Sequence, residues 1–253
     1  MILTHLGASG LGLRLGGARL LLDPPTAPDA PTVLTWTETE RIAGVRSGPA
    51  PVVGASPTVL AWLGLTGVAL QVDPVDVDGW SVRALPYPPI PYATPREGVR
   101  KMLSAIRSPL QASSRLRHLV RRPVTPPLAL SLARDGCVIV VLGQALHRFT
   151  PEADLERLVQ AFRGADVLVA GTDYDDEEAT GRLAGLFGAR TVVIADLTGP
   201  VRRMLHLPTR PLHTVLATAP AGTLLLEEGG ELALPGYALR TSSSVRGNVV
   251  SGI

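Results

Sequence analysis

The first 35 residues alternate between apolar and polar side chains with the period of a β-strand. Three strands are predicted here, over residues 2–6, 11–15 and 19–22. Gly16-Gly17 separates the second strand from the third and is typical of a two-residue hairpin turn. Asp23-Pro24-Pro25 then ends the third strand, and residues 32–35 predict a short buried fourth. The N-terminal part is therefore expected to form a sheet that contains antiparallel pairs.

Strands and helices alternate along the middle of the chain. Ser56-Pro57 predicts the start of a helix, because Ser is a favoured N-cap and Pro is favoured at the first helical position. Further strands are predicted at 51–54, 68–72, 80–85, 128–133, 137–142, 166–170 and 191–195, with a turn at Asp135-Gly136 between two of them. Thr150-Pro151-Glu152 is predicted to cap a helix that runs to Phe162, and further helices are predicted at 176–187 and at 199–205. Residues 214–234 return to strands around Glu228-Gly229-Gly230. This order predicts an α/β sandwich with antiparallel parts, formed as a single domain over residues 1–253.

Composition excludes several classes of protein. At 253 residues and 45% hydrophobic content, the chain is able to bury a large core. A single cysteine, Cys137, excludes an internal disulfide and a thiolate-cluster metal site, and its apolar neighbours predict a buried strand residue. No apolar run approaches the roughly 18 residues that span a bilayer. The N-terminus shows no signal-peptide pattern, so we expect a cytoplasmic protein without a membrane partner.

Basic residues are concentrated in one segment. Residues 96–122 contain eight Lys or Arg and one Glu, although the whole chain carries a formal charge of only +2. The pattern predicts a helical, basic insertion at about 93–126, broken near Pro109. The candidate anion-binding side chains are Arg115, Arg117, Arg121 and Arg122. An arginine guanidinium is able to bind a phosphate group through two parallel hydrogen bonds. The alternative interpretation is that these arginines only form the solvated face of a helix. Because no aromatic residues are interleaved, single-stranded nucleic acid is a less favoured partner.

The run from Gly7 to Gly12 matches a glycine-rich dinucleotide-binding loop only superficially. In that motif a helix must follow, because the pyrophosphate binds at the helix N-terminus. Here strands follow, so a tight turn is the better interpretation. The five histidines also lack the close spacing of a preformed zinc site.

Residues 1–44 contain a set of features in a fixed order. They are the small-residue turn Gly7-Ala8-Ser9, the hairpin Gly16-Gly17, the strand end Asp23-Pro24, the loop Trp36-Thr37-Glu38-Thr39-Glu40-Arg41 after a short strand, and Ile42-Ala43-Gly44. In this order they resemble the start of the metallo-β-lactamase fold hydrolases, most closely the ascorbate-phosphate lactonase branch. The resemblance implies a four-layer αββα sandwich with mixed sheets. It also implies a metal centre at the loop, where the family carries T-H-x-H-x-D-H.

The positions that match family metal ligands carry other residue types. In chain order they are Trp36, Glu38, Glu40, Arg41, Tyr87, Gln144 and Asp196, which the resemblance gathers into one remnant pocket. Trp36 has no ligating atom, and Arg41 puts a cation where a dication would sit. We therefore expect no metal and no other cofactor. We also expect Arg41 to form ion pairs with Glu38 and Glu40 in place of the metal.

Two classes of function remain open. The favoured hypothesis is a catalytically degenerate member of the fold that binds or regulates, with an anionic small molecule or a protein as its partner. The alternative is a metal-dependent hydrolase of lactonase or phosphoesterase type, with Glu38, Glu40 and Asp196 as oxygen ligands for Mg²⁺ or Mn²⁺. The same carboxylates acting as general acid and base without a metal form a third possibility. Trp36 and Tyr87 are candidates to line a pocket for a small organic ligand. The alternative for Trp36 is that its side chain only fills the space that the metals occupy in the family.

Overall fold

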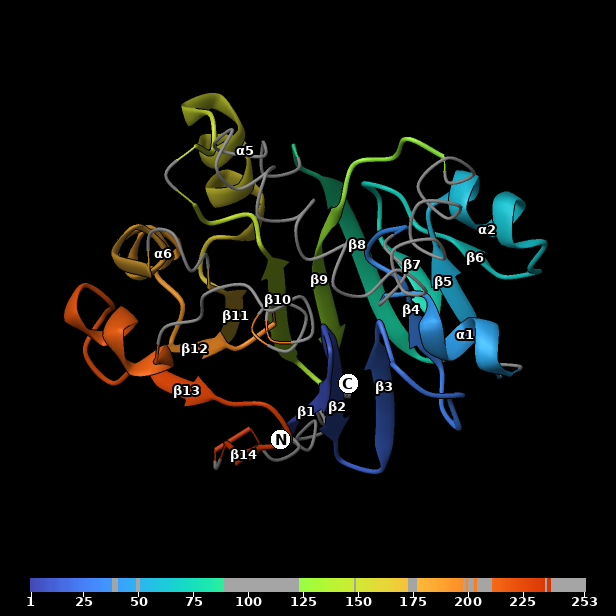
Figure 1. The fold of residues 1–253 in the computed structure, drawn as a ribbon, viewed down its shortest axis with the longest axis horizontal. Helices are drawn as coiled ribbons and strands as arrows, with labels where there is room; N and C mark the ends of the chain where they lie inside the picture. The colour runs from blue at the N-terminus through green and yellow to red at the C-terminus, as the bar shows by residue number, and fades with distance from the viewer. Residues whose placement is uncertain are drawn as a thin grey trace, which may run out of the picture.

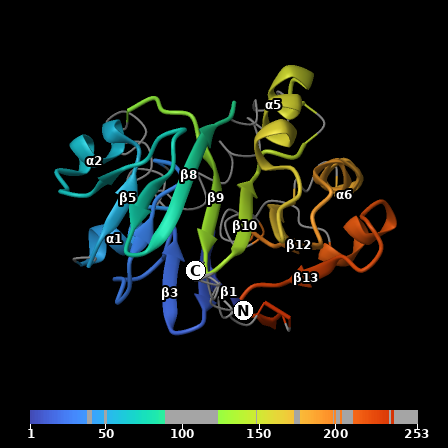
Figure 2. The same ribbon diagram turned by 180° about the vertical axis from the view of Figure 1, so that it is seen from behind.

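The computed structural model describes residues 1–37, 41–48, 51–88, 123–147, 149–172, 177–197, 199, 203, 211–234 and 236–237. Two seven-stranded sheets face each other and form the centre of the molecule (Figure 1). The predicted α/β sandwich with mixed sheets is confirmed. Figure 2 shows the same arrangement from behind.

The first sheet is built mainly from the N-terminal strands. In spatial order it contains β14 (Glu231–Ala233), β1 (Ile2–Gly7), β2 (Gly10–Leu15), β3 (Ala18–Leu22), β4 (Thr32–Val33), β5 (Val53–Ala55) and β6 (Val68–Ala69). The strands from β14 to β3 pair antiparallel, and those from β3 to β6 pair parallel. The Gly16-Gly17 hairpin is confirmed, since Leu15 pairs with Ala18 across it.

The second sheet is built mainly from the C-terminal half. In spatial order it contains β13 (Leu224–Leu226), β12 (Thr191–Ala195), β11 (Val167–Gly171), β10 (Cys137–Gly143), β9 (Leu128–Arg134), β8 (Trp80–Pro86) and β7 (Val75–Val77). The strands from β10 to β13 are parallel, and β9 is antiparallel to both its neighbours. Cys137 is a buried strand residue, as predicted.

Helices cover the outer face of each sheet. On the first sheet, α1 (Ala43–Ser47) and α2 (Pro57–Leu63) share an apolar cluster with β5. On the second, α5 (Glu152–Phe162), α6 (Glu177–Ala184), η1 (Gly185–Phe187) and η2 (Leu212–Ala217) lie beside the strands, and residues of α5, η1 and η2 share an apolar cluster with them (Figure 1). Between the sheets, alternate residues of β2 point inward, including Leu11, Leu13 and Leu15, each exposed by 2% or less. The inward direction of these leucines follows the period of two that the sequence shows in this strand.

Several local predictions were wrong. The pattern missed α1 and β7, which are short. Residues 214–217 belong to the 3-10 helix η2 and not to a strand. Thr150 does not cap α5. Its hydroxyl donates to the Ala145 carbonyl at 2.6 Å, and α5 begins after Pro151 without a side-chain cap. Ser56, by contrast, caps α2 as predicted, with its hydroxyl 3.4 Å from the Val59 N–H.

Most of the predicted basic insertion, including its four candidate arginines, lies outside the described residues. Among the helices that the structure describes, none is long and apolar enough to cross a membrane.

Candidate functional site

The strands that precede the predicted site residues all end at one edge of the sandwich. In the first sheet β1, β3 and β4 run in the same direction, and in the second β8, β10 and β12 do so. Hydrogen bonds between the sheets show that these ends meet. The Leu128 N–H donates to the Thr35 carbonyl at 2.9 Å, and the His5 ring lies 2.8 Å from the Asp196 carbonyl. Residues after these strands therefore face one another at what we term the carboxyl edge.

A buried ionic cluster occupies the carboxyl edge next to β3 and β4. The Arg41 guanidinium donates from Nη1 to Oδ2 of Asp23 at 2.8 Å and to the Thr35 hydroxyl at 2.7 Å. The Thr35 N–H and hydroxyl donate to the two Asp23 oxygens at 2.8 and 2.5 Å. Asp23 is 1% exposed and Arg41 is 3% exposed. Charge-assisted bonds of this kind are among the strongest that a protein forms, and here they satisfy both Asp23 oxygens.

Burial and backbone geometry both mark Asp23 as an unusual residue. Desolvation raises the pKa of its carboxyl above the ordinary value, against the opposing effects of Arg41 and of the hydrogen bonds from Thr35. Its φ angle of 46° lies in the left-handed region, which is sparsely populated outside glycine. Such geometry persists only where surrounding contacts determine it, and the bonds from Thr35 and Arg41 provide these contacts.

Trp36 and Tyr87 are fixed by the segment that leads into β9. The Trp36 indole donates from Nε1 to the Thr125 carbonyl at 2.7 Å, and the Tyr87 N–H donates to the Pro127 carbonyl at 3.0 Å. The Tyr87 hydroxyl accepts from the Gln144 N–H at 3.3 Å. It also lies against Gly143, where an added Cβ would come within 2.9 Å of it. Tyr87 thus fills the position beside the β10 turn, and its side chain is buried.

A second ionic cluster surrounds Asp196 at the end of β12. Oδ1 of Asp196 accepts from the Gly199 N–H at 2.9 Å, and Oδ2 faces the Arg203 guanidinium at 3.3 and 3.4 Å. Arg203 also contacts Glu228 at 2.5 Å. Because the Gly7 N–H donates to Nδ1 of His5, Nε2 must carry the ring proton and donate it to the Asp196 carbonyl. The two carboxylate oxygens of Asp196 and its backbone carbonyl oxygen therefore all contact polar groups of the protein.

The described side chains at the carboxyl edge do not fit the metal centre that the resemblance implies. Trp36 offers no ligand atom, and Arg41 brings a buried positive charge. The Asp196 carboxylate already accepts a hydrogen bond from the Gly199 N–H, and its contact with the Arg203 guanidinium places a positive charge where a cation would bind. Within the described part of the chain, no three His, Cys, Asp or Glu side chains come together as a metal site.

The structure places five of the predicted site residues at this edge, namely Trp36, Arg41, Tyr87, Gln144 and Asp196. Glu38 and Glu40 lie outside the described residues, so their predicted ion pairs with Arg41 stay a prediction. The carboxylate that the structure does place against Arg41 belongs to Asp23. Sequence reasoning used Asp23 only as a strand terminator and missed Thr35, Arg203, Glu228 and His5. A long-range partner for a buried Arg leaves no local pattern that would reveal it.

Comparisons with known proteins identify the fold. No family model matches the sequence, and no curated protein matches it significantly. Among solved structures, the isothiocyanate hydrolase from Delia radicum gut bacteria is similar over 92% of this chain and 99% of its own, at 15% identity and a TM-score of 0.59.

A novel metallo hydrolase from the archaeon Ignicoccus hospitalis is similar over 92% of this chain and 98% of its own, with 14% identity and a TM-score of 0.58. The metallo-β-lactamase fold protein YhfI from Bacillus subtilis covers 91% and 98% of the two chains, with 16% identity and a TM-score of 0.57. The chain therefore has the metallo-β-lactamase fold, and the similarity extends over nearly its whole length.

Proposed function

We propose that this chain is a metallo-β-lactamase fold protein in which internal ion pairs take the place of the metal centre, and that it acts as a binding or regulatory protein. The observation that carries the proposal is the buried contact between Arg41 and Asp23 at the carboxyl edge. The resemblance aligns Arg41 with a family metal ligand, and Nη1 of this side chain donates to Asp23 and Thr35 at the strand ends.

Electrostatics supports this interpretation. A dication about 4 Å from a guanidinium is repelled by roughly 8 kcal/mol at an effective dielectric constant of about 20. Asp23 offsets part of this repulsion, but its oxygens already accept bonds from Thr35 and Arg41. A metal at this position would therefore compete with contacts that hold the fold.

The same argument applies at the other end of the site. Asp196 is the described member of the alternative oxygen-ligand set, and its carboxylate is bound by Arg203 and by the Gly199 N–H. A hydrolase that used Asp196 as a ligand would have to hold its cation beside the Arg203 guanidinium, which repels it. The partner that fits the proposal best is anionic, because the segment 96–122 is strongly basic.

Metal content decides between the two functions. Untagged protein, dialysed without chelator and then incubated with Mg²⁺, Mn²⁺ or Zn²⁺, is measured by plasma mass spectrometry. We expect less than about a tenth of an equivalent of any of these metals. A matched variant with Trp36→His, Glu38→His, Glu40→Asp and Arg41→His restores the family ligand types and should take up Zn²⁺.

One or two equivalents in the wild-type protein would contradict the proposal and favour the hydrolase. The variants Glu38→Ala and Glu40→Ala then test the role of the two glutamates. If the proposal is right, they leave any phosphoesterase or lactonase signal unchanged. A signal that disappears in both variants would assign these carboxylates to catalysis.

A further inference from the structure

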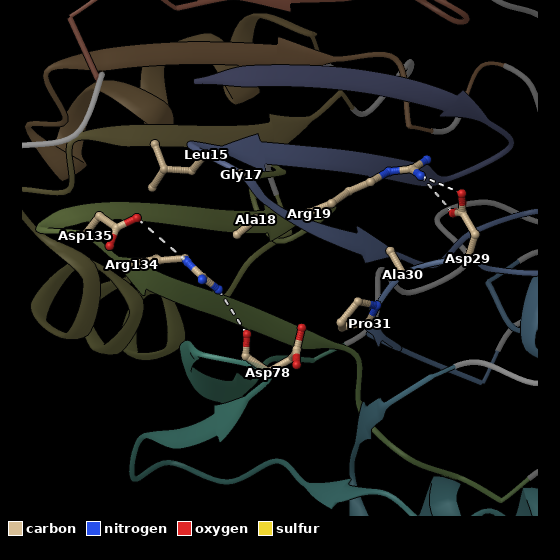
Figure 3. A pocket seen from close by; sticks show the side chains of 10 residues that line it. All are labelled: Leu15, Gly17, Ala18, Arg19, Asp29, Ala30, Pro31, Asp78, Arg134 and Asp135. Atoms are coloured by element: carbon tan, nitrogen blue, oxygen red, sulfur yellow. Dashed lines mark hydrogen bonds and ion pairs between the residues drawn. The ribbon is translucent and has the colours of Figure 1, made fainter.

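A pocket lies at the edge of the sandwich opposite the carboxyl edge. Three hairpin turns border it, one between β2 and β3, one between β7 and β8, and one between β9 and β10 (Figure 3). The turn residues that line it are Gly17, Asp78 and Asp135. Its volume is about 430 Å³, which is within the usual range for sites that bind small molecules. We refer to it as the turn pocket.

The backbone of the turns holds the charged groups of the turn pocket in place. Asp78 and Asp135 have φ angles of 54° and 51°, and each is followed by a glycine with positive φ. These are the conformations of tight two-residue hairpin turns, in which the first residue has little freedom. The two carboxylates therefore project from rigid supports, as a preorganised site requires.

Arg134 provides the opposite charge in the same pocket. Its Nη1 donates to the Asp78 carbonyl at 3.0 Å, and its Nε lies 3.8 Å from the Asp135 carboxylate. The guanidinium also lies over the Trp80 ring, 5.6 Å from the ring centroid. Among the described residues, neither Nη2 of Arg134 nor the Asp78 carboxylate has a hydrogen-bond partner. A donor and an acceptor of opposite charge, neither of them bonded to another described residue, thus line the same pocket.

The remaining walls of the turn pocket differ in character. Ala18 and Pro31, which are half-buried, supply a small apolar surface, whereas Leu15 and Ala30 are buried beneath it (Figure 3). The outer charged residues, Arg19 and Asp29, satisfy each other through two bonds of 2.8 Å. The carboxylates do not converge on one point, since no three acidic side chains of the described chain are placed to hold a metal ion. The described carboxylates of the pocket are therefore not arranged as a metal site.

We propose that the turn pocket binds a small zwitterion of the amino-acid type. The ligand carboxylate accepts hydrogen bonds from Nη2 of Arg134, its ammonium group donates to the Asp78 carboxylate, and an aliphatic side chain lies on the apolar wall. This site lies at the opposite edge from the proposed binding function and does not depend on it.

The test compares three probes by NMR titration of ¹⁵N-labelled protein. L-leucine carries both charges, 4-methylpentanoate lacks the ammonium group, and 3-methylbutylamine lacks the carboxylate. We expect L-leucine alone to shift the amide signals of Gly17, Gly79 and Gly136 in a saturable manner. Equal responses to a singly charged probe, or no saturable shift with L-leucine, would overturn the proposal.

Two variants and one control locate the binding. Asp78→Asn keeps the shape and tolerates the positive φ, whereas Arg134→Gln removes the guanidinium. Each should weaken L-leucine binding by about tenfold or more, since hydrogen bonds to charged groups are lost. Asp154→Asn, on α5, removes a half-buried carboxylate outside the pocket and should leave affinity unchanged. If Arg134→Gln does not fold, Asp78→Asn and the three probes still test the proposed site. L-leucine binding that is undiminished in Asp78→Asn would refute it.

Discussion

Arg41 and Asp23 are 18 residues apart in the chain, yet their side chains meet at 2.8 Å and are only 3% and 2% exposed. The pair joins the end of β3 to the segment that begins α1. A buried pair of this kind contributes little when compared with apolar side chains of similar size, but breaking it leaves an uncompensated charge in the interior. The carboxyl edge therefore depends on both members being present.

Removing Arg41 should destabilise the protein strongly. We expect Arg41→Ala to lower the free energy of unfolding by about 3–5 kcal/mol, because the Asp23 carboxylate stays buried without its cation. Urea unfolding followed by circular dichroism measures the change. The double variant Asp23→Ala, Arg41→Ala should recover part of the loss, since neither charge is then unpaired.

The matched control for this experiment is an exposed pair of the same type. Arg19 and Asp29 also lie 2.8 Å apart, but their side chains are 48% and 73% exposed. Arg19→Ala should therefore cost less than about 1 kcal/mol. Similar losses for Arg41→Ala and Arg19→Ala would show that the buried pair is solvated in solution.

The ionisation of Asp23 should make stability depend on pH. Because burial raises its pKa, the folded protein holds a proton that the unfolded chain releases above its ordinary pKa of 3.8. The stabilisation from this group is complete below 3.8 and is lost as the pH rises through the folded pKa. Wild-type protein should thus lose stability relative to Asp23→Asn as the pH rises above 3.8 and through the folded pKa of Asp23. The opposite slope would mean that Arg41 outweighs desolvation.

Gly44 should be intolerant of any side chain. A Cβ at this position would lie 2.2 Å from the carbonyl oxygens of both Pro24 and Thr26, and the Gly44 N–H donates to the Pro24 carbonyl at 2.8 Å. Gly44→Ala is expected to cost about 1–3 kcal/mol or more, because backbone atoms must move apart. At Gly17 an added Cβ meets nothing within 4 Å, so Gly17→Ala serves as the control in a thermal unfolding assay. Equal melting temperatures for the two variants would contradict the close approach of α1 to the segment after β3.

The basic segment should give the protein affinity for polyanions. We expect salt-sensitive retention on a heparin column, because arginines bind anions through charge and forked hydrogen bonds. The variant with Arg115, Arg117, Arg121 and Arg122 changed to Ala should elute at a clearly lower salt concentration. The matched comparison is between two double variants: Arg182→Ala, Arg190→Ala removes two positive charges outside the segment, and Arg115→Ala, Arg117→Ala removes two within it. Retention that does not respond to salt would remove this segment as a binding element.

Local sequence determined much of the fold. Apolar alternation predicted β1, β2 and β3, because side chains alternate strictly across a strand. Dipeptides with left-handed preferences placed two hairpin turns, at Gly16-Gly17 and Asp135-Gly136. The sequence did not predict α1 and β7, because elements this short carry too few residues to show a clear pattern.

Tertiary structure alone decided which groups meet. The sequence places Glu38 and Glu40 beside Arg41, so local reasoning favoured those carboxylates, whereas sheet order brings Asp23 against it. Likewise, Arg203 meets Asp196 and Glu228, and the turn pocket assembles from hairpins of both sheets. A residue's own neighbours set its backbone conformation and the face on which it lies. The partner of a buried charge depends on strand order and register across the whole chain, which no local pattern encodes.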